Sequence, residues 1–260
     1  MPEIQFKGVN IHFTEQGSGS AVVLLHGFLE SSWIWKDITP SLAKNHRIIC
    51  VDLPGHGLSD CVGYVHSMDE MADVVHEVLK SIKLRKAVLI GHSMGGYVAL
   101  AFAEKYPDSV KSLILYQSTA KADSPALKKD RNRVIELAKT NHKAFIKKSI
   151  PMLLRPVNRQ RLKTELNALK EEALKTSQQG IIAALSGMRD RPNREVLLKF
   201  APYPVHIIAG DKDPRILFEE SKSQAEISER VQFHVIKGSG HMSYIEDLPQ
   251  TIERLREALR

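Results

Sequence analysis

The chain has few of the residues that would place it in a membrane, a disulfide scaffold or a metal site. Its 260 residues include two cysteines, Cys50 and Cys61, which match no metal-ligand spacing and are too few for a disulfide framework. No apolar run reaches the roughly 18 residues that a membrane-spanning helix needs. The start, MPEIQFKGVNIHF, lacks the basic and apolar regions of a signal peptide. We therefore expect a cytoplasmic protein without stable membrane insertion, metal or cofactor.

Positive charge is unevenly spread along the chain. The net charge is +7, but residues 121–200 hold 19 Lys and Arg against 8 Asp and Glu, while the other residues hold 18 against 22. No recognised nucleic-acid-binding motif accompanies this basic stretch, so we do not expect nucleic acid as a partner. The simplest interpretation of the charge is a solvated face. The alternative is attraction of an acidic substrate or an acidic carrier protein.

Short apolar runs alternate with helical patterns over most of the chain. The runs are rich in Leu and β-branched residues and mostly lack polar alternation, which is typical of strands buried on both faces of a parallel sheet. They cover residues 21–25, 47–51, 86–90, 110–115, 205–209 and 231–236, and helical patterns cover 68–82, 95–106 and 248–259. This alternation predicts an α/β fold with a mostly parallel, doubly wound sheet. Two alternating stretches, 3–7 and 9–15, predict an antiparallel hairpin at its edge.

The alternation stops near residue 118 and resumes near residue 204. Between these points only helical patterns occur, separated by prolines, and they cover residues 125–141, 143–152, 160–178 and 180–188. We therefore predict three parts: residues 1–118 as the first part of the core, 119–200 as an all-helical insertion, and 201–260 as the second part of the core.

A serine lies between glycines at the junction of a predicted strand and a predicted helix. The stretch Gly91-His92-Ser93-Met94-Gly95 follows the strand at 86–90. Strand, glycine-bounded turn and helix form the context of a nucleophile elbow. Such a turn strains the serine backbone, lifts the hydroxyl above the sheet, and aims the first helical N–H groups, including that of Met94, at a reacting oxygen. The alternative is a solvated serine in a glycine-rich turn.

A serine nucleophile needs a base, and the base needs an orienting carboxylate. His241 is the candidate base, because its loop follows the last strand and opens at the carboxyl end of the sheet, as Ser93 does. Asp211 and Asp213 follow the strand at 205–209 at the same end. We favour Asp213, because Asp211 directly follows the terminal glycine of the strand and is placed to bond the turn.

The other histidines are assigned no chemistry. The turn should aim His92 away from the hydroxyl of Ser93, and the histidines within strands are expected to be packing residues. His12, His206 and His234 fall in strands, while His46, His66, His76 and His142 are expected to be exposed.

The order Ser93, Asp213, His241 is that of the α/β-hydrolases, and the chain resembles this family over nearly its whole length. The matching stretches are LLHGFLESSWIW (24–35), VDLPGHGLSD (51–60), GHSMGGYVALAFAEKYPDSVKSLIL (91–115), IIAGDKDP (207–214) and GSGHMSYIEDLP (238–249). The resemblance implies that Ser93 is the nucleophile, that His241 is the base and that Asp213 orients it.

The resemblance also bears on the residues around this triad. It implies that the backbone N–H of Phe28 joins that of Met94 as an oxyanion donor, and that His26 and Gly27 shape the loop before Phe28. A further loop with a structural role contains Asp52, Gly55, Gly57 and Ser59.

These features predict a serine hydrolase that cleaves small to medium carboxylic esters through an acyl-enzyme on Ser93. The helical insertion resembles the family's cap. Its apolar residues are expected either to line an acyl pocket or to pack on the body, and they include Phe145, Ile146, Met152, Leu153 and Leu154. A lactonase, thioesterase or C–C bond hydrolase would use the same triad. A small-molecule receptor of this fold is the alternative from another class.

Overall fold

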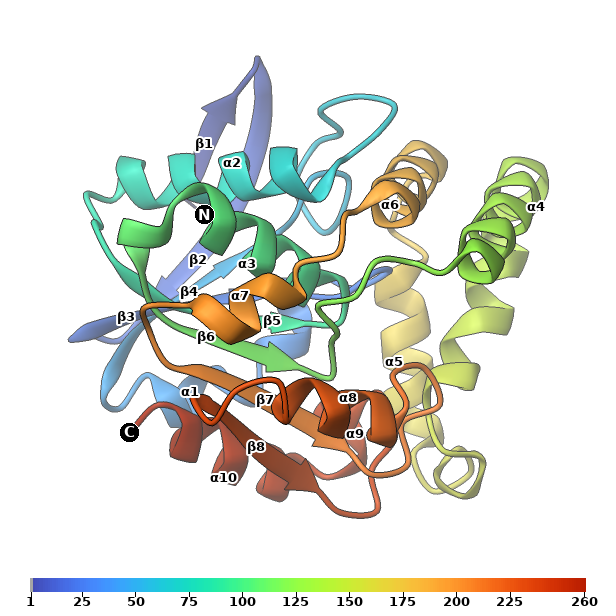
Figure 1. Cartoon of the computed structure of the whole chain (residues 1–260). Helices are drawn as coiled ribbons and strands as arrows, with labels where there is room; N and C mark the ends of the chain where they lie inside the picture. Colours follow the sequence, from blue (N-terminus) through green and yellow to red (C-terminus); the bar gives the residue numbers. More distant parts are fainter. Residues whose placement is uncertain (1) are drawn as a thin grey trace.

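The computed structural model describes residues 2–260, which contain one sheet of eight strands (Figure 1). The strands are β1 (Glu3–Phe6), β2 (Val9–Gln16), β3 (Ser20–Leu25), β4 (His46–Val51), β5 (Ala87–His92), β6 (Val110–Tyr116), β7 (Val205–Gly210) and β8 (Val231–Ile236). Their order across the sheet is β1-β2-β4-β3-β5-β6-β7-β8. Strands β1 and β2 form an antiparallel edge hairpin, and β3 to β8 are parallel. The predicted fold class is confirmed.

Helices cover both faces of the sheet. Figure 1 shows α2 (Met68–Ser81) and α3 (Met94–Lys105) on one side and α10 (Leu248–Ala258) on the other, near the short α1 (Thr39–Leu42). Helix α2 begins where the side chain of Ser67 accepts a hydrogen bond from Glu70 N, which satisfies one of the free N–H groups of the first turn. Its apolar residues recur every three or four positions, so one face is buried against α3 and the sheet edge.

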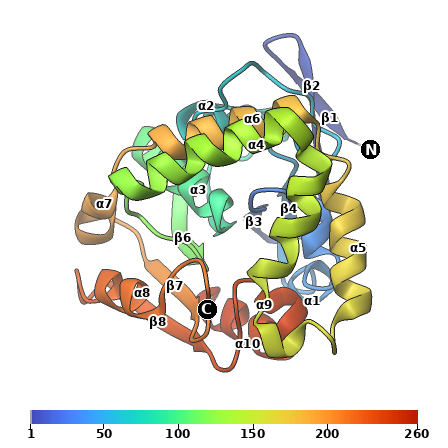
Figure 2. The same ribbon diagram turned by 90° about the vertical axis from the view of Figure 1, so that its right-hand side faces the viewer.

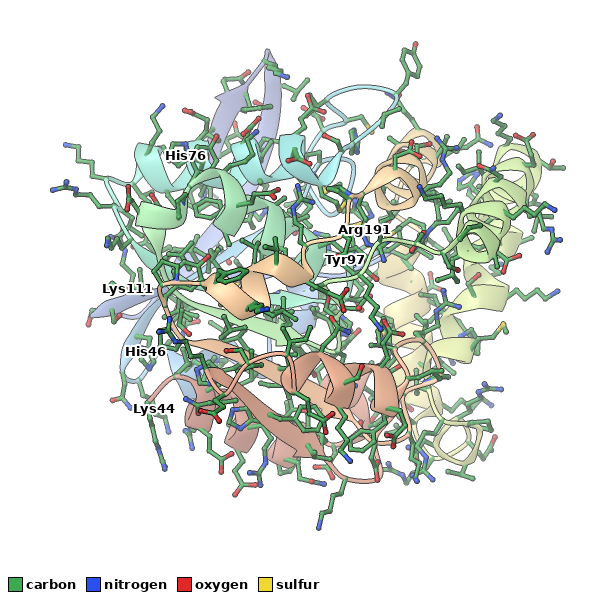
Figure 3. The ribbon with its side chains drawn as sticks, in the orientation of Figure 1. Lys44, His46, His76, Tyr97, Lys111 and Arg191 are labelled. Carbon is green, nitrogen blue, oxygen red and sulfur yellow. The ribbon has the colours of Figure 1, made fainter. Side chains whose placement is uncertain are left out.

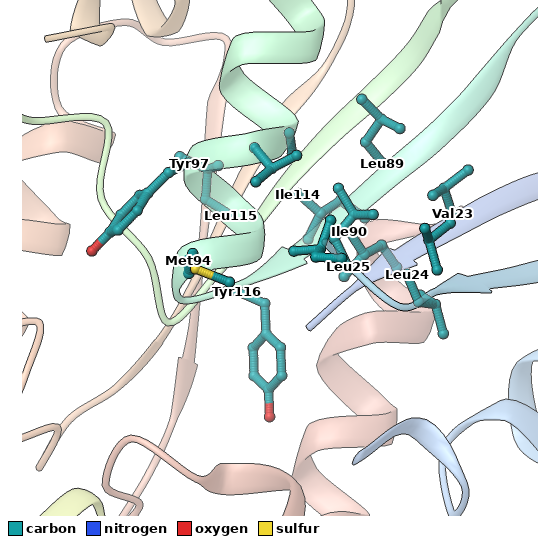
Figure 4. Packing of buried hydrophobic residues seen from close by; sticks show 14 of the residues in the cluster. Val23, Leu24, Leu25, Leu89, Ile90, Met94, Tyr97, Ile114, Leu115 and Tyr116 are labelled. Atoms are coloured by element: carbon teal, nitrogen blue, oxygen red, sulfur yellow. The ribbon is translucent and has the colours of Figure 1, made fainter. Parts of the chain in front are cut away.

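The centre of the sheet lies in a continuous apolar core. Strand β3 from Ala21 to Leu25 and strand β6 from Ser112 to Tyr116 are buried without interruption, because layers of helices cover both faces. Figure 4 shows this packing, with Leu25, Ile90 and Ile114 of the strands grouped beneath α3, the helix that begins at Met94. The parallel strands therefore lack polar alternation because both of their faces are buried, as their sequences indicated.

Between β6 and β7 the described chain forms helices and no strand. These are α4 (Pro125–Ser149), η3 (Ile150–Leu153), η4 (Pro156–Asn158), α5 (Lys163–Ala173), α6 (Gln178–Asp190) and α7 (Glu195–Phe200), where η marks a short 3₁₀ helix. Figure 2 shows α4 and α6 side by side over α3. We call residues 119–200 the helical segment.

The helices of this segment differ in their bounds from the sequence patterns. The two patterns that meet near residue 142 form one helix, α4, kinked at Asn141, where φ is −157° and ψ is 82°. The side chain of Asn141 accepts a hydrogen bond from Ala144 N at 2.9 Å and so caps the second half. The helix predicted over 160–178 is shorter in the structure, where α5 ends at Ala173 and Ser177 caps the start of the next helix, α6.

The strand that follows the helical segment is succeeded by a helix that the sequence patterns did not indicate. Helix α8 (Phe218–Ala225) packs on β7 and β8, and the short α9 (Ser243–Glu246) precedes α10. Among residues 2–260, no helix combines the length and the apolar character needed to cross a membrane.

Candidate active site

Ser93 occupies a strained turn between β5 and α3. Its backbone has a φ of 50° and a ψ of −114°, a conformation that costs a non-glycine residue free energy. A side chain at Gly91 would overlap the backbone of Gly95, and one at Gly95 would overlap the carbonyl of Leu25. Only glycine fits at these two positions, because the helix turns back against the strand. The sequence therefore folds here into a sharp strand–turn–helix with Ser93 at its apex.

The structure brings Ser93, His241 and Asp213 into one chain of hydrogen bonds. The Nε2 of His241 lies 2.9 Å from the Oγ of Ser93, and its Nδ1 lies 2.8 Å from Oδ2 of Asp213. The other oxygen of Asp213 accepts the backbone N–H groups of Arg215, at 2.7 Å, and Ile216, at 3.0 Å. Because these bonds hold the carboxylate, its free oxygen is fixed toward the imidazole.

Asp211 lies apart from this chain. Its Oδ1 accepts the backbone N–H of Gly238 at 2.6 Å, which ties the loop after β7 to the end of β8. This is the turn-bonding position that the sequence indicated for Asp211. The geometry thus separates the two aspartates, with Asp213 alone on the imidazole of His241.

His92 points away from the Ser93 hydroxyl and into a buried polar network beneath the site. Its Nδ1 lies 2.9 Å from Oε2 of Glu30, and its Nε2 lies 3.0 Å from the carbonyl of His241. Glu30 also accepts hydrogen bonds from Tyr244 Oη at 2.9 Å and from Gly27 N at 2.6 Å. The network joins the loop before Phe28 to the backbone of the candidate base.

The two buried ionisable groups of this network stabilise each other in charged form. Burial alone would lower the pKa of His92, but the Glu30 carboxylate reverses this and the pKa is raised. Burial alone would raise the pKa of Glu30, but His92 and the N–H of Gly27 hold it below its ordinary value. The sequence analysis missed Glu30 and Tyr244. Both lie in the quoted family-like stretches, but nothing in their spacing indicated a contact across 214 positions.

The two predicted oxyanion donors come from two different parts of the body, the start of α3 and the loop after β3. Met94 is the first residue of α3, where a helix leaves its N–H groups without intrahelical partners and carries positive dipole charge. Phe28 follows a loop shaped by His26, which donates from Nδ1 to Gly27 O at 2.7 Å and accepts Leu53 N at Nε2 at 2.9 Å. Phe28 lines the same cavity as Ser93.

The loop that contains Asp52 shows only structural contacts. Asp52 accepts the backbone N–H groups of Ser32 and Leu58 and contacts His12 Nδ1 at 2.8 Å. A side chain at Gly57, where φ is 55°, would overlap the Asp52 carboxylate. Ser59 donates to the carbonyl of Asp52 at 2.6 Å.

The prediction that His66 is exposed is wrong. Its side chain is fully buried, and its Nε2 accepts the backbone N–H of Val62 at 3.2 Å. The backbone N–H of His66 donates to the carbonyl of Ala183 in α6 at 3.0 Å. The helical segment therefore covers a loop that would be solvent-exposed on the body alone.

A cavity of about 290 Å³ opens above Ser93 and His241. Its walls come from both the body and the helical segment. About half of the lining side chains are apolar, and most of the wall surface is apolar. Of the five segment residues considered as acyl-pocket candidates, Phe145, Met152 and Leu153 line the cavity, whereas Ile146 and Leu154 are fully buried in the core. Charged residues also line the cavity, among them Lys121, Asp123, Arg131 and Arg191.

No group of three or more His, Cys, Asp or Glu side chains within residues 2–260 is arranged to hold a metal ion. Ser93, His241 and Asp213 are joined by hydrogen bonds, so this arrangement can move a proton between a hydroxyl and an imidazole held by a carboxylate. The N–H groups at the start of α3 can accept negative charge.

A parallel sheet with an elbow serine, a late histidine and an aspartate after the strand past a helical segment defines an α/β-hydrolase. The family model described as the alpha/beta hydrolase fold matches residues 20–248, and the chain belongs to this family.

Known proteins with similar sequence or structure include several hydrolases. The structure of a thermophilic esterase from Thermogutta terrifontis, solved with malate bound, is 32% identical, with a TM-score of 0.95 over 100% of this chain and 98% of that chain. An enol-lactonase from Burkholderia xenovorans LB400 is 19% identical, with a TM-score of 0.91 over 99% of each chain, and so shares the fold. A putative 2-succinyl-6-hydroxy-2,4-cyclohexadiene-1-carboxylate synthase from Bacillus subtilis is 27% identical over 92% of this chain and 90% of its own length. Family membership and the similarity to the esterase support hydrolase activity.

Proposed function

We propose that this protein is a serine carboxylesterase that cleaves small to medium carboxylic esters. Ser93 is the nucleophile, His241 the general base and Asp213 the orienting carboxylate. The observation that carries the proposal is the hydrogen-bonded chain from Ser93 Oγ through His241 to Asp213, with distances of 2.9 and 2.8 Å. This chain opens on a largely apolar cavity of about 290 Å³, a size suited to a small acyl group.

In the first half of the reaction, Ser93 Oγ attacks the ester carbonyl while His241 Nε2 takes its proton. The negative charge that develops on the carbonyl oxygen is stabilised by the N–H groups of Phe28 and Met94. Each oxyanion donor of this kind contributes roughly 3 to 4 kcal/mol to transition-state stabilisation in known serine hydrolases. His241 then returns the proton to the leaving alcohol, which departs and leaves the acyl group on Ser93.

In the second half, water enters and the cycle repeats on the acyl-enzyme. His241 removes a proton from the water, the oxygen attacks the acyl carbonyl, and Ser93 leaves with the proton. Asp213 holds the imidazole in the tautomer with a proton on Nδ1 and stabilises the imidazolium form. The backbone N–H groups of Arg215 and Ile216 keep this carboxylate in place.

Residues 119–200 act as a cap over this site in the proposed mechanism. Phe145 and Met152 line the cavity from the segment, and the ring centroid of Phe145 lies 6.5 Å from that of Phe28 of the body. The backbone N–H of His241 also donates to the carbonyl of Leu153 at 3.1 Å, so the cap contacts the loop of the base directly. A cytoplasmic location and an acidic partner for the basic cap stay predictions.

Substrate panels test the proposal. Acyl p-nitrophenyl esters of increasing chain length, lactones and thioesters are assayed side by side with wild-type protein and Ser93→Ala. We expect many turnovers per site on short esters and none with the variant. An enol-lactonase among the fold neighbours makes lactones the second substrate class to compare. A single turnover on every ester would favour a receptor and contradict the proposed function.

A further inference from the structure

Two arginines share one buried aspartate in the wall of the candidate active-site cavity. Asp123 accepts from Arg131 Nε at 2.7 Å on Oδ2 and from Arg191 Nη1 at 2.5 Å on Oδ1. All three side chains line the cavity that contains Ser93. We call them the arginine cluster. One carboxylate between two guanidinium groups leaves a charge of +1 that no residue of the cluster neutralises.

The guanidinium of Arg191 keeps unused donors although its side chain is only 4% exposed. Its Nη1 is occupied by Asp123 and by the carbonyl of Met188, at 2.8 Å. Its Nε is buried without a partner, and within residues 2–260 its Nη2 donates no hydrogen bond. An arginine has donors arranged in a fork that fits a carboxylate, and burying them unpaired costs free energy. An anion in the cavity that accepts from Nη2 would use a donor that residues 2–260 leave free.

Arg191 is held at a defined place relative to the nucleophile. Its guanidinium lies over the ring of Tyr97, with its central carbon 3.9 Å from the ring centroid, and Figure 3 shows the two side chains together. Tyr97 follows Ser93 by four residues on α3, about one helical turn or roughly 6 Å along the axis. Tyr97, Arg191 and Ser93 line one cavity, so a single small molecule can reach both the hydroxyl and the guanidinium.

The remaining charges in the cavity wall nearly cancel. Lys121 and Arg215 are opposed by Asp130 and Glu220, and Glu220 also accepts a hydrogen bond from the hydroxyl of Thr119 at 2.8 Å. The remaining acid of the wall, Glu30, is neutralised by its ion pair with His92 at 2.9 Å. The excess is therefore the single positive charge of the arginine cluster. A monoanionic carboxylate matches this excess, whereas a phosphate dianion would exceed it.

We propose that Arg191, supported by Arg131 through Asp123, is a specificity subsite for a carboxylate carried by the ester substrate. The preferred substrates are then small esters with a free carboxylate a few carbons from the scissile bond, such as half-esters of short dicarboxylic acids. This inference rests on the proposed esterase function, since it concerns the same cavity. It adds the charge and position of the group that the cavity selects.

Kinetics with matched substrates test the subsite. The anionic substrates are monomethyl half-esters, with the carboxylate on the acyl side, and acetate esters of hydroxy acids, with it on the alcohol side. Each has a neutral analogue in which CH(CH₃)₂ replaces the carboxylate with the same shape. The measured quantity is the ratio of kcat/KM for the anionic ester to that for its neutral analogue. In Arg191→Gln we expect this ratio to fall roughly 10- to 100-fold for at least one of the two series.

Arg189→Gln is the matched control, because Arg189 lies two residues away and pairs with Asp190 outside the cavity. Its ratio should stay at the wild-type value. Arg191→Lys keeps the charge but loses the planar fork, and we expect it to retain part of the selectivity. A ratio in Arg191→Gln that stays within about twofold of wild type for both series would overturn the subsite.

A binding measurement separates failure of the subsite from failure of the esterase proposal. Ser93→Ala is titrated with the dicarboxylates glutarate and adipate by calorimetry, and so is the double variant with Arg191→Gln. Binding that weakens at least tenfold in the double variant supports the subsite even if no ester is turned over. Equal binding by the two variants contradicts it, while hydrolysis of neutral esters by the wild type would still uphold the esterase.

Discussion

The body and the helical segment of this protein share one apolar core, but charged contacts play a larger part in the segment. The body, residues 1–118 and 201–260, is built on a parallel sheet whose central strands are mostly apolar and buried. The segment also buries apolar side chains in the common core, among them Ile146, Ile150 and Leu154, and it adds ion pairs to the body near its C-terminal end. Arg194, whose side chain is only 3% exposed, bonds both Asp69 of α2 and Glu104 of α3. Apolar burial therefore stabilises both regions, and paired charges add to it where the segment meets α2 and α3.

This difference corresponds to a division of labour in the candidate active site. The groups proposed to react, Ser93, Asp213 and His241, all come from loops at one end of the body's sheet. The groups proposed to choose the substrate, such as Arg191 and Phe145, come from the segment. A change in the body should therefore alter the rate for every ester, while a change in the segment should alter the order of preference among esters.

The largest effect is expected from the reacting groups of the body. Ser93→Ala and His241→Ala should each lower kcat on p-nitrophenyl esters by at least about 10³-fold, because each removes a member of the proton-transfer chain. The kcat of Asp213→Asn should fall far more than that of Asp211→Asn, because Asp211 bonds only a turn. Circular dichroism checks that each variant is folded. If a variant at Ser93 or His241 retains more than about a tenth of the wild-type kcat, the proposed role of that residue in catalysis is wrong.

A smaller effect is expected where the two regions meet at the loop of the base. Glu246 accepts the backbone N–H of Gly240, next to His241, at 3.0 Å, and on its other oxygen it accepts Asn158 Nδ2 at 2.6 Å. Glu246→Ala frees this loop, and a misplacement of about 1 Å costs up to roughly 10²-fold in rate. We expect kcat to fall about 10- to 100-fold, measured beside Glu253→Ala, an exposed glutamate, as the control. A lower Tm with unchanged kcat would mean that Glu246 has a structural role only.

The sequence predicted the body better than the segment, for a physical reason. Buried parallel strands and the elbow are local patterns, so the sheet and the positions of Ser93, Asp213 and His241 could be inferred from runs of a few residues. The pairing of Glu30 with His92, 62 positions apart, depends on how the loops meet and leaves no periodic trace. The same holds for Asp123 and Arg191, which are 68 positions apart.

The error at His66 has the same origin. Its neighbours read as a polar loop, and only the arrival of α6 makes the site an interior one. A side chain at Gly187 of α6 would overlap the carbonyl of His66, which shows how closely the helix approaches. Helix bounds in the segment also shifted, because Asn141 and Ser177 act as caps inside what looked like loops or continuous helix.

Acid should lower the free energy of unfolding of this protein through its buried histidines. Burial lowers the pKa of His56 to about 3, and it also lowers the pKa values of His26 and His66. Below the unfolded value of about 6.5, the unfolded chain binds protons that the native protein does not, so stability falls as the pH falls from about 6.5 toward 3. The slope approaches about 1.4 kcal/mol per pH unit for each such histidine. His92, whose pKa is raised, contributes with the opposite sign.

Urea unfolding at a series of pH values checks this expectation. In His56→Gln the slope of the free energy of unfolding against pH should decrease by the equivalent of about one bound proton. His142→Gln in α4 is the comparison variant. The carboxylates reduce the free energy of unfolding only at lower pH, because the pKa of Asp52 is lowered. Burial alone would raise this pKa, but nearby histidine charge and backbone N–H donors lower it by more. An unchanged slope in His56→Gln would show that His56 is not the group that titrates.

The smallest effect is expected from the basic charge on the outer face of the segment. Lys128, Lys129, Arg133, Lys147 and Lys148 are exposed, whereas Arg131 of the same stretch lines the cavity. Exposed charges act on the encounter with substrate, over a Debye length of roughly 8 to 10 Å near physiological ionic strength. Raising salt from ~0.02 to ~0.5 M should therefore lower kcat/KM for an anionic ester, by less than about tenfold, and leave kcat unchanged.

A double variant separates this steering from direct contact with Arg191. Lys128→Gln with Lys129→Gln should weaken the salt dependence for the anionic ester, yet preserve the preference for it over the neutral analogue at high salt. Arg191→Gln should do the reverse, because a contact inside the cavity is screened much less than charge on an exposed helix. If the anionic and neutral esters depend equally on salt, the outer charge has no part in substrate capture. A pull-down with an acidic carrier protein then tests whether this face docks a partner instead.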